Sequence, residues 1–159
     1  MDAIRSFLST QYDLITESRA VLLEYCGQLS TQELNTQNSS FGRGSVSNLL
    51  VHIGNTYLFW IGEVCMKKEM AYLDYGTIIS IQEIHHHFSK ADMLMTSFLK
   101  DDHRDMLSTS DYSINGVKGT APNFKIITHV LTHEFHHKGQ ILSLTRHLGY
   151  VPVDTDIMR

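Results

Sequence analysis

The sequence predicts an all-α protein built as a four-helix bundle, and three observations lead to that prediction. Apolar residues recur at steps of three and four along four long stretches, which is the spacing of one face of a helix. The two prolines, Pro122 and Pro152, lie outside those stretches. With 159 residues, 42% of them hydrophobic, the chain can bury a core of domain size. We expect one helical domain over residues 1–159.

The first helix is predicted over about residues 2–26. Its inward face is formed by residues at steps of three and four, namely Ile4, Phe7/Leu8, Gln11, Ile15, Leu22 and Tyr25/Cys26. Residues 27–44 are rich in Gly, Ser, Asn and Gln, and that composition is typical of a loop.

The second and third helices each follow a serine that can cap them. Ser45 or Ser47 can accept a hydrogen bond from the first turn of the second helix, and Ser80 can do the same for the third. The inward face of the second helix is predicted to carry Leu49, His52, Ile53, Thr56, Trp60 and Val64. That of the third is predicted to carry Ile84, His87/Phe88, Ala91, Met95 and Phe98.

A long polar connection over residues 100–121 precedes the fourth helix. Asn115-Gly116 within it is a strong signal for a tight hairpin turn. The fourth helix should start near Pro122, which suits a first helical turn, and end before Gly149. Its inward face is predicted to carry Ile126, Val130, His133, His137, Ile141, Leu144 and Leu148. Four such helices indicate an antiparallel type of bundle.

Charge and hydropathy exclude several classes of protein. Thirteen Lys and Arg against seventeen Asp and Glu give a net charge of −4, and no basic cluster suggests a nucleic-acid partner. No segment approaches the roughly 20 apolar residues of a membrane span. The N-terminus lacks the apolar run of a signal peptide, and Cys26 and Cys65 make no disulfide framework. We therefore expect a cytoplasmic protein.

The ten histidines are the unusual feature of the composition. His133 and His137 are four residues apart, so they lie on one face of a helix, and that face is the apolar one. His52 is a third inward histidine on another helix. A single inward histidine is more often a core residue, but buried imidazoles need partners, and a divalent metal ion supplies one. We predict a metal site at His52, His133 and His137.

Three imidazoles suit a catalytic metal better than a structural one. A structural zinc ion fills all four positions with protein ligands, whereas a catalytic ion keeps one open. The ion lowers the pKa of a bound water or thiol and so makes a nucleophile near neutral pH. Imidazole spacing alone does not distinguish zinc, nickel, manganese and iron.

Two segments resemble a known family. Residues 133–141 (HEFHHKGQI), followed by residues 148–152 (LGYVP), resemble the signature of the DinB-like (damage-inducible, YfiT-like) four-helix bundles. That signature is a histidine, three residues, a second histidine, a basic residue and Gly-Gln. Residues 48–53 (NLLVHI), with Trp60 further along, resemble the helix that carries the family's first ligand. The likeness extends over essentially the whole chain in helix order and length.

The resemblance implies a metal site and a class of chemistry. It implies one divalent ion, most often nickel or zinc, on His52, His133 and His137. Family members of known activity include thiol-dependent transferases and isomerases that use low-molecular-weight thiols, and others are regarded as metal-dependent hydrolases. The implied partner is a small-molecule substrate, for example a low-molecular-weight thiol, in detoxification or stress metabolism. Separately from the resemblance, two bundles could pair through an exposed apolar face to form a homodimer. No catalytic side chain is implied, since chemistry varies on a shared fold.

Other interpretations of the same residues stay open. Residues 133–137 fit the H-E-x-x-H helix of zinc proteases, with Glu134 as general base, although Gln140 stands where the longer form of that motif has Gly. A non-catalytic bundle that binds a metal or small ligand is a further alternative. A di-iron carboxylate bundle would use the Glu-x-x-His pairs at residues 83–86 and 134–137, but the order of these helices along the chain is wrong for it. Its remaining carboxylates would come from Glu17, Glu24 or Glu63.

The remaining histidines are assigned subordinate places. His129 lies four residues before His133, but residues eight apart on a helix lie about 12 Å apart along its axis, so His129 and His137 cannot share one ion. We expect His129 at the rim of the site. We expect His85 and His86 to be exposed and His87 to be partly buried. Aromatic residues at helical spacing, such as Trp60, are expected to be core residues first.

Overall fold

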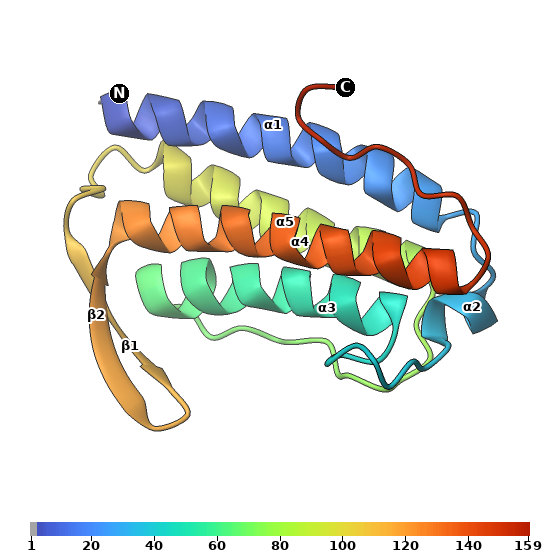
Figure 1. Cartoon of the computed structure of the whole chain (residues 1–159). Coiled ribbons are helices and arrows are strands. Elements are labelled where there is room, and N and C mark those ends of the chain that lie inside the picture. The colour runs from blue at the N-terminus through green and yellow to red at the C-terminus, as the bar shows by residue number, and fades with distance from the viewer. Residues whose placement is uncertain (1–2) are drawn as a thin grey trace.

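Four long helices form the molecule in the computed structural model, which describes residues 3–159 (Figure 1). The predicted all-α class is confirmed, because only one small two-stranded sheet accompanies the helices. The helix predicted to begin at residue 2 begins at Ala3, and residue 2 lies outside the described residues. The long helices are α1 (Ala3–Cys26), α3 (Val46–Tyr57), α4 (Ile81–Lys100) and α5 (Asn123–His147).

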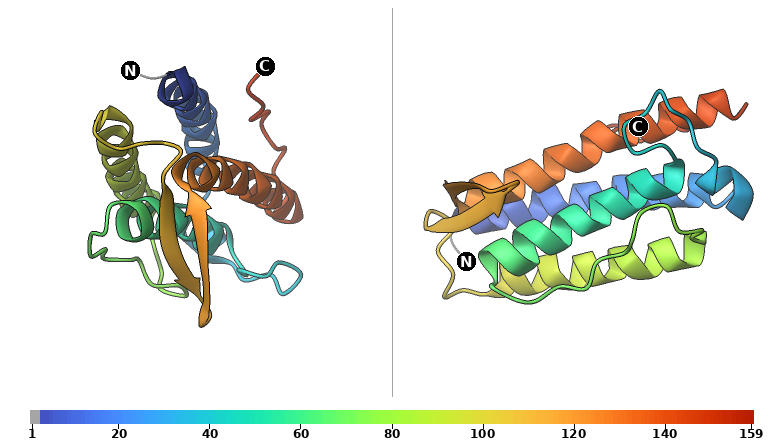
Figure 2. Two further views of the ribbon diagram at one scale, coloured as in Figure 1. Left: turned by 90° about the vertical axis from the view of Figure 1, so that its left-hand side faces the viewer. Right: turned by 90° about the horizontal axis from the view of Figure 1, so that it is seen from below.

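The helix α3 packs against both α4 and α5. The helix α1 packs against the same two helices from the other side of the bundle (Figure 2). The helix α3 continues directly into a π-helical segment, Leu58–Cys65. The expected antiparallel arrangement holds for α3 and α5 but is wrong for α3 and α4. These two run in the same direction, because residues 66–80 lead the chain back along the length of the bundle (Figure 1).

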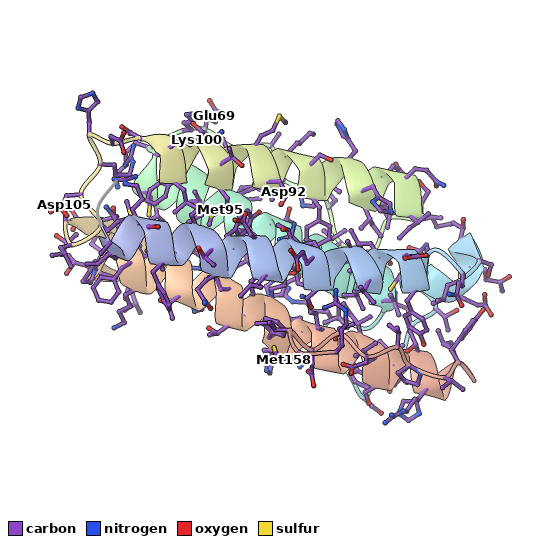
Figure 3. All side chains as sticks on the ribbon, turned by 90° about the horizontal axis from the view of Figure 1, so that it is seen from above. Glu69, Asp92, Met95, Lys100, Asp105 and Met158 are labelled. Atoms are coloured by element: carbon purple, nitrogen blue, oxygen red, sulfur yellow. The ribbon has the colours of Figure 1, made fainter. Side chains whose placement is uncertain are left out.

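The core lies between the four helices and consists of aliphatic and aromatic side chains. Leu22, Leu49 and Met95 have no exposed surface, and Figure 3 shows Met95 between the ribbons of α1 and α4. Each such side chain contributes about 1.5–3 kcal/mol through burial. Both cysteines are buried and free. Among the described residues, no helix is long and apolar enough to cross a membrane.

The helix starts follow the serine signals. Ser45, and not Ser47, caps α3 by accepting a hydrogen bond from the Asn48 backbone at 3.1 Å. Ser80 caps α4, and its partner Glu83 completes a capping box. The same Ser-x-x-Glu pattern starts the short helix α2 (Thr31–Asn35), so the prediction of a continuous loop over residues 27–44 was wrong there. Pro122 lies one residue before α5 instead of within its first turn.

The predicted hairpin is confirmed and lies at the end of the bundle where α5 begins (Figure 1). Strands β1 (Thr109–Ile114) and β2 (Val117–Pro122) pair antiparallel. Asn115 and Gly116 both have positive φ angles, 51° and 80°, as a two-residue turn of this type requires. Tyr112 packs edge-on against Trp60 with ring centroids 5.1 Å apart, which holds the hairpin against the π-helical segment.

Candidate metal centre

Three histidines from two helices direct their ring nitrogens at one point. The Nε2 atom of His133 in α5 lies 3.0 Å from Nε2 of His52 in α3 and 3.1 Å from Nε2 of His137. Two nitrogens that each lie about 2.1 Å from one ion are about 3 Å apart when they subtend a right angle at it. Within residues 3–159, these three side chains form a group whose ligand atoms all lie within 4.8 Å of one another. The geometry fits three ligands on one face of an ion.

Hydrogen bonds on the opposite sides of two rings orient them. The Nδ1 atom of His137 donates to Oε1 of Gln140 at 2.8 Å. Because an amide oxygen only accepts, His137 carries its proton on Nδ1 and leaves the lone pair of Nε2 free. The Nδ1 atom of His52 lies 3.1 Å from the Tyr75 hydroxyl. Partners of this kind typically fix the tautomer and direction of metal-binding histidines.

The three imidazoles are neutral at pH 7. Burial lowers the pKa of His52 to about 3, with nearby Arg43 as a further cause. Burial likewise lowers the pKa of His133 to about 4, with His137 beside it as the next cause. Burial also lowers the pKa of His137. A neutral imidazole is the form that binds a metal ion, so no proton must be displaced when one binds at pH 7.

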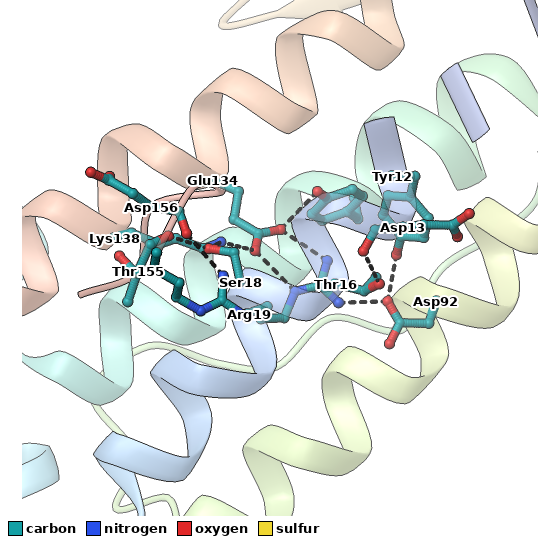
Figure 4. Close-up of polar contacts among 12 residues, drawn as sticks. Tyr12, Asp13, Thr16, Ser18, Arg19, Asp92, Glu134, Lys138, Thr155 and Asp156 are labelled. Carbon is teal, nitrogen blue, oxygen red and sulfur yellow. Dashed lines mark hydrogen bonds and ion pairs between the residues drawn. The ribbon is translucent and has the colours of Figure 1, made fainter. Parts of the chain in front are cut away.

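Glu134 faces away from the histidines, into the core. Its carboxylate accepts hydrogen bonds from Nε and Nη2 of Arg19, at 3.0 and 2.9 Å, and from the Tyr57 hydroxyl, at 2.8 Å. It also forms an ion pair with Nζ of Lys138 at 3.3 Å (Figure 4). Burial alone would raise the pKa of Glu134, but the charges of Arg19 and Lys138 hold it below its ordinary value. The carboxylate is therefore ionised and fully engaged. It does not occupy the place of a general base beside a metal on His133 and His137.

The buried charges continue toward the chain terminus. Lys138 donates to the Ser18 hydroxyl at 2.8 Å, and Ser18 in turn donates to the backbone oxygen of Thr155 (Figure 4). Arg19 also pairs with Asp92 of α4. These contacts tie α1, α4 and the C-terminal segment to the side of α5 that faces away from the site.

A pocket of about 760 Å³ opens on His52 and His133. Phe59 and Trp60 of the π-helical segment line it, and both are partly buried and also pack against the core, as expected. Ser113, Ile114 and Asn115 of the hairpin also line the pocket. Tyr57, by contrast, is buried in the core as expected. The pocket gives a small molecule a path to two of the three histidines.

The other histidines are as exposed as the sequence predicts, except for one that is more buried. His129 is exposed at the rim of the pocket, with its ring 5.4 Å from that of His133. His85 and His86 are exposed, while His87 is more deeply buried than expected, at 2% exposure. Since Glu83 caps α4, the residues needed for a di-iron centre do not converge in the described part of the chain.

Some residues of the site carry no signal in the sequence that could have identified them. Tyr75 belongs to residues 66–80, whose path along the bundle cannot be derived from composition. The ion pair of Glu134 with Lys138 is visible as a spacing of four residues. Its burial is not visible, because the sequence alone does not show that Arg19 lies opposite.

Comparison with known proteins shows the family of the chain. The sequence model described as "DinB family" matches residues 5–159, a range that includes all three histidines. The chain is also similar to a Bacillus subtilis (strain 168) protein described as "Uncharacterized protein YizA". The two are 27% identical over 139 residues, which cover 84% of this chain and 83% of that protein. That description names no activity, so the likeness extends to the family and not to a substrate.

Proposed function

The chain belongs to the DinB family, and from that premise we propose that it is a metal-dependent enzyme. One divalent ion is bound by His52, His133 and His137, with zinc or nickel as the first candidates and iron or manganese as further ones. The observation that carries the proposal is the convergence of three Nε2 atoms, 3.0 and 3.1 Å apart, at a pocket. The three-histidine group supports metal binding, and the pocket beside it supports catalysis because a substrate could reach the bound ion.

Three protein ligands leave positions free for an exogenous ligand. A divalent ion there would lower the pKa of a bound thiol or water, so that it reacts near neutral pH. The protein residues supply the rest. Gln140 and Tyr75 hold two of the imidazoles in place, and Phe59 and Trp60 offer apolar surface against which an electrophilic substrate can pack.

The reaction we propose is the transfer of a low-molecular-weight thiol to an electrophilic small molecule, in detoxification or stress metabolism. The thiol loses its proton, its sulfur forms a bond to the electrophilic carbon, and the leaving group departs with its electron pair. Hydrolysis by an activated water is the corresponding reaction when water takes the place of the thiol.

Thiol conjugation by the zinc- or nickel-loaded protein tests the proposal. We expect conjugation of cysteine or glutathione to monochlorobimane above the uncatalysed rate. It should be lost in His133→Ala, with the helical circular dichroism unchanged. His86→Ala, which changes an exposed histidine of α4, is the matched control and should keep full activity. Conjugation that persists in His133→Ala would remove the three-histidine site from the mechanism.

A non-catalytic metal-binding bundle is distinguished by the open coordination positions. In the cobalt-substituted protein, azide or imidazole should change the visible spectrum by binding to the ion. A spectrum that is indifferent to both would indicate a closed site and favour the non-catalytic alternative.

A further inference from the structure

The formally charged side chains that line the pocket at the histidines are negative. Apart from the histidines, whose pKa values burial lowers, Glu63 and Asp74 are its acidic or basic lining residues, and no lysine or arginine of the described chain lines it. The rest of the lining is aromatic, aliphatic, amide, hydroxyl or imidazole. The pocket therefore favours a ligand that carries positive charge at this point.

Glu63 lacks the cation that a half-buried carboxylate usually has. It lies in the π-helical segment, is partly buried, and accepts a hydrogen bond from the Tyr72 hydroxyl. Among residues 3–159, no lysine, arginine or histidine nitrogen lies within 4.0 Å of the carboxylate of Glu63 or Asp74. Lys118 lines the adjoining cavity of about 730 Å³ but makes no ion pair with Glu63. An arriving ammonium group would form the charge-assisted hydrogen bond that the protein does not supply.

Aromatic rings line the same pocket as this carboxylate. Phe59 and Trp60 pack edge to face with ring centroids 5.1 Å apart, and both line the pocket together with Tyr72. Ring faces attract cations, so a carboxylate among aromatic side chains is the combination that proteins use for ammonium groups. This observation is independent of the charge of Glu63 and indicates the same ligand chemistry.

The cationic end and the metal end of the pocket are well separated. His52 and Glu63 are eleven residues apart on one continuous helical stretch, α3 and the π-helical segment. At the rise of about 1.5 Å per residue of an α-helix, they lie about 16–17 Å apart along the helix. A ligand that reaches both must be elongated, and its positive charge is then kept away from a bound divalent ion.

We infer that the pocket takes an elongated small molecule with a metal-binding donor at one end and an ammonium group at the other, held by Glu63 and the rings of Trp60 and Phe59. The inference rests on the proposed function for the donor end. Recognition of the ammonium group depends on the pocket residues and not on a metal ion, so it is tested in the protein both with and without metal.

Trp60 is the single tryptophan of the chain and lies in the pocket wall, so its fluorescence reports binding there. We would titrate the zinc-loaded and metal-free protein at pH 7 with benzylamine, benzyl alcohol and benzoate. Benzylamine is protonated at this pH and has no lone pair for the metal, so it tests charge recognition. We expect it to bind about tenfold more tightly than the alcohol, the factor typical of one charged hydrogen bond at a partly buried site. In the metal-free protein, benzoate should bind least.

Glu63→Gln is the decisive variant, because the amide keeps an oxygen for Tyr72 while it removes the charge. It should bring the affinity for benzylamine down to that for benzyl alcohol. Glu17→Gln makes the same change at an exposed position of α1 and should leave the preference intact. Equal affinity of Glu63→Gln and the original protein for benzylamine, tighter binding of benzoate, or no saturable binding of any probe would overturn the inference. The comparison with benzoate is made in the metal-free protein, because a carboxylate can bind an open position of a zinc ion, and failure here is therefore distinguishable from failure of the metal site.

Discussion

Arg19 and Glu134 are 115 residues apart in the sequence, yet they form a two-point ion pair in the core, with N–O distances of 3.0 and 2.9 Å. Glu134 directly follows His133. The pair therefore fixes the rotation of α5 about its axis. Glu134 and Lys138 then face α1, and the two ligand histidines of α5 face His52. The ligand histidines and the buried charges lie on different faces of the same helix, about 100° apart around its axis.

Removal of one partner from this pair should be costly. We expect Arg19→Met to lower the free energy of unfolding by about 3 kcal/mol, because among residues 3–159 it leaves Lys138 as the one cation paired with the buried Glu134. Urea denaturation followed by circular dichroism measures the change. Arg146→Met alters an exposed arginine of α5 and should shift the value by less than about 0.5 kcal/mol. Equal stability of the two variants would show that the ion pair does not hold α5.

The hydrogen bond from His137 to Gln140 should contribute to metal affinity. Gln140→Leu removes the acceptor that keeps the His137 proton on Nδ1. We expect the dissociation constant for zinc to rise about tenfold, as is typical when the hydrogen-bond partner of a ligand histidine is lost. Competition with a chromophoric chelator gives the constant. Ser143→Ala, at an exposed position of the same helix, is the control. An unchanged constant in Gln140→Leu would mean that the amide does not orient the ring.

Gly54 permits the close approach of α3 and α4. A Cβ atom at this position would lie 2.2 Å from Cδ2 of His87, so Gly54→Ala forces the two helices apart or displaces the imidazole. We expect a loss of about 1–3 kcal/mol of stability, typical of overpacking in a core. The double variant Gly54→Ala/His87→Ala has room for the methyl group. It should therefore lose less stability than the sum of its two single variants, and strict additivity would contradict the contact.

His87 should make stability depend on pH. Burial lowers its pKa to about 4, against an ordinary value of 6.5, and its Nε2 atom has no hydrogen-bond partner among the described residues. Between these pH values the unfolded chain binds a proton that the folded one does not. The free energy of unfolding should therefore fall by about 2–3 kcal/mol as the pH is lowered from 6.5 to 4.

His87→Leu removes this contribution, whereas His86→Leu, at an exposed neighbour, does not. The difference between the two variants across the pH range isolates His87, because the histidines of the site contribute equally to both. Parallel curves for the two variants would show that the buried imidazole titrates normally.

Local signals in the sequence were sufficient for most of the fold. Serine caps, apolar periodicity and the Asn115-Gly116 turn each act over a few residues, so the long helices and the hairpin could be predicted from them. The direction of α4 could not, because it depends on how residues 66–80 cross the bundle. Short helix α2 was missed although its Ser30–Glu33 capping box is visible in the sequence.

The candidate site was predictable where it follows helical spacing. His133 and His137 share a face by their separation of four residues, and His52 was inferred from its place on an apolar face. The convergence of α3 and α5, by contrast, is a tertiary property. The contacts of Tyr75 with His52 and of Arg19 with Glu134 join segments whose proximity only the folded chain establishes.

The metal content of the untagged protein, measured by elemental analysis, tests the central claim most directly. We predict about one divalent ion per chain in the original protein and in His86→Ala, and a loss of that ion in His52→Ala. Protein purified without chelators that contains no metal, and takes up none when zinc, nickel, manganese or iron is supplied, would contradict the claim. An ion that His52→Ala retains would contradict it as well.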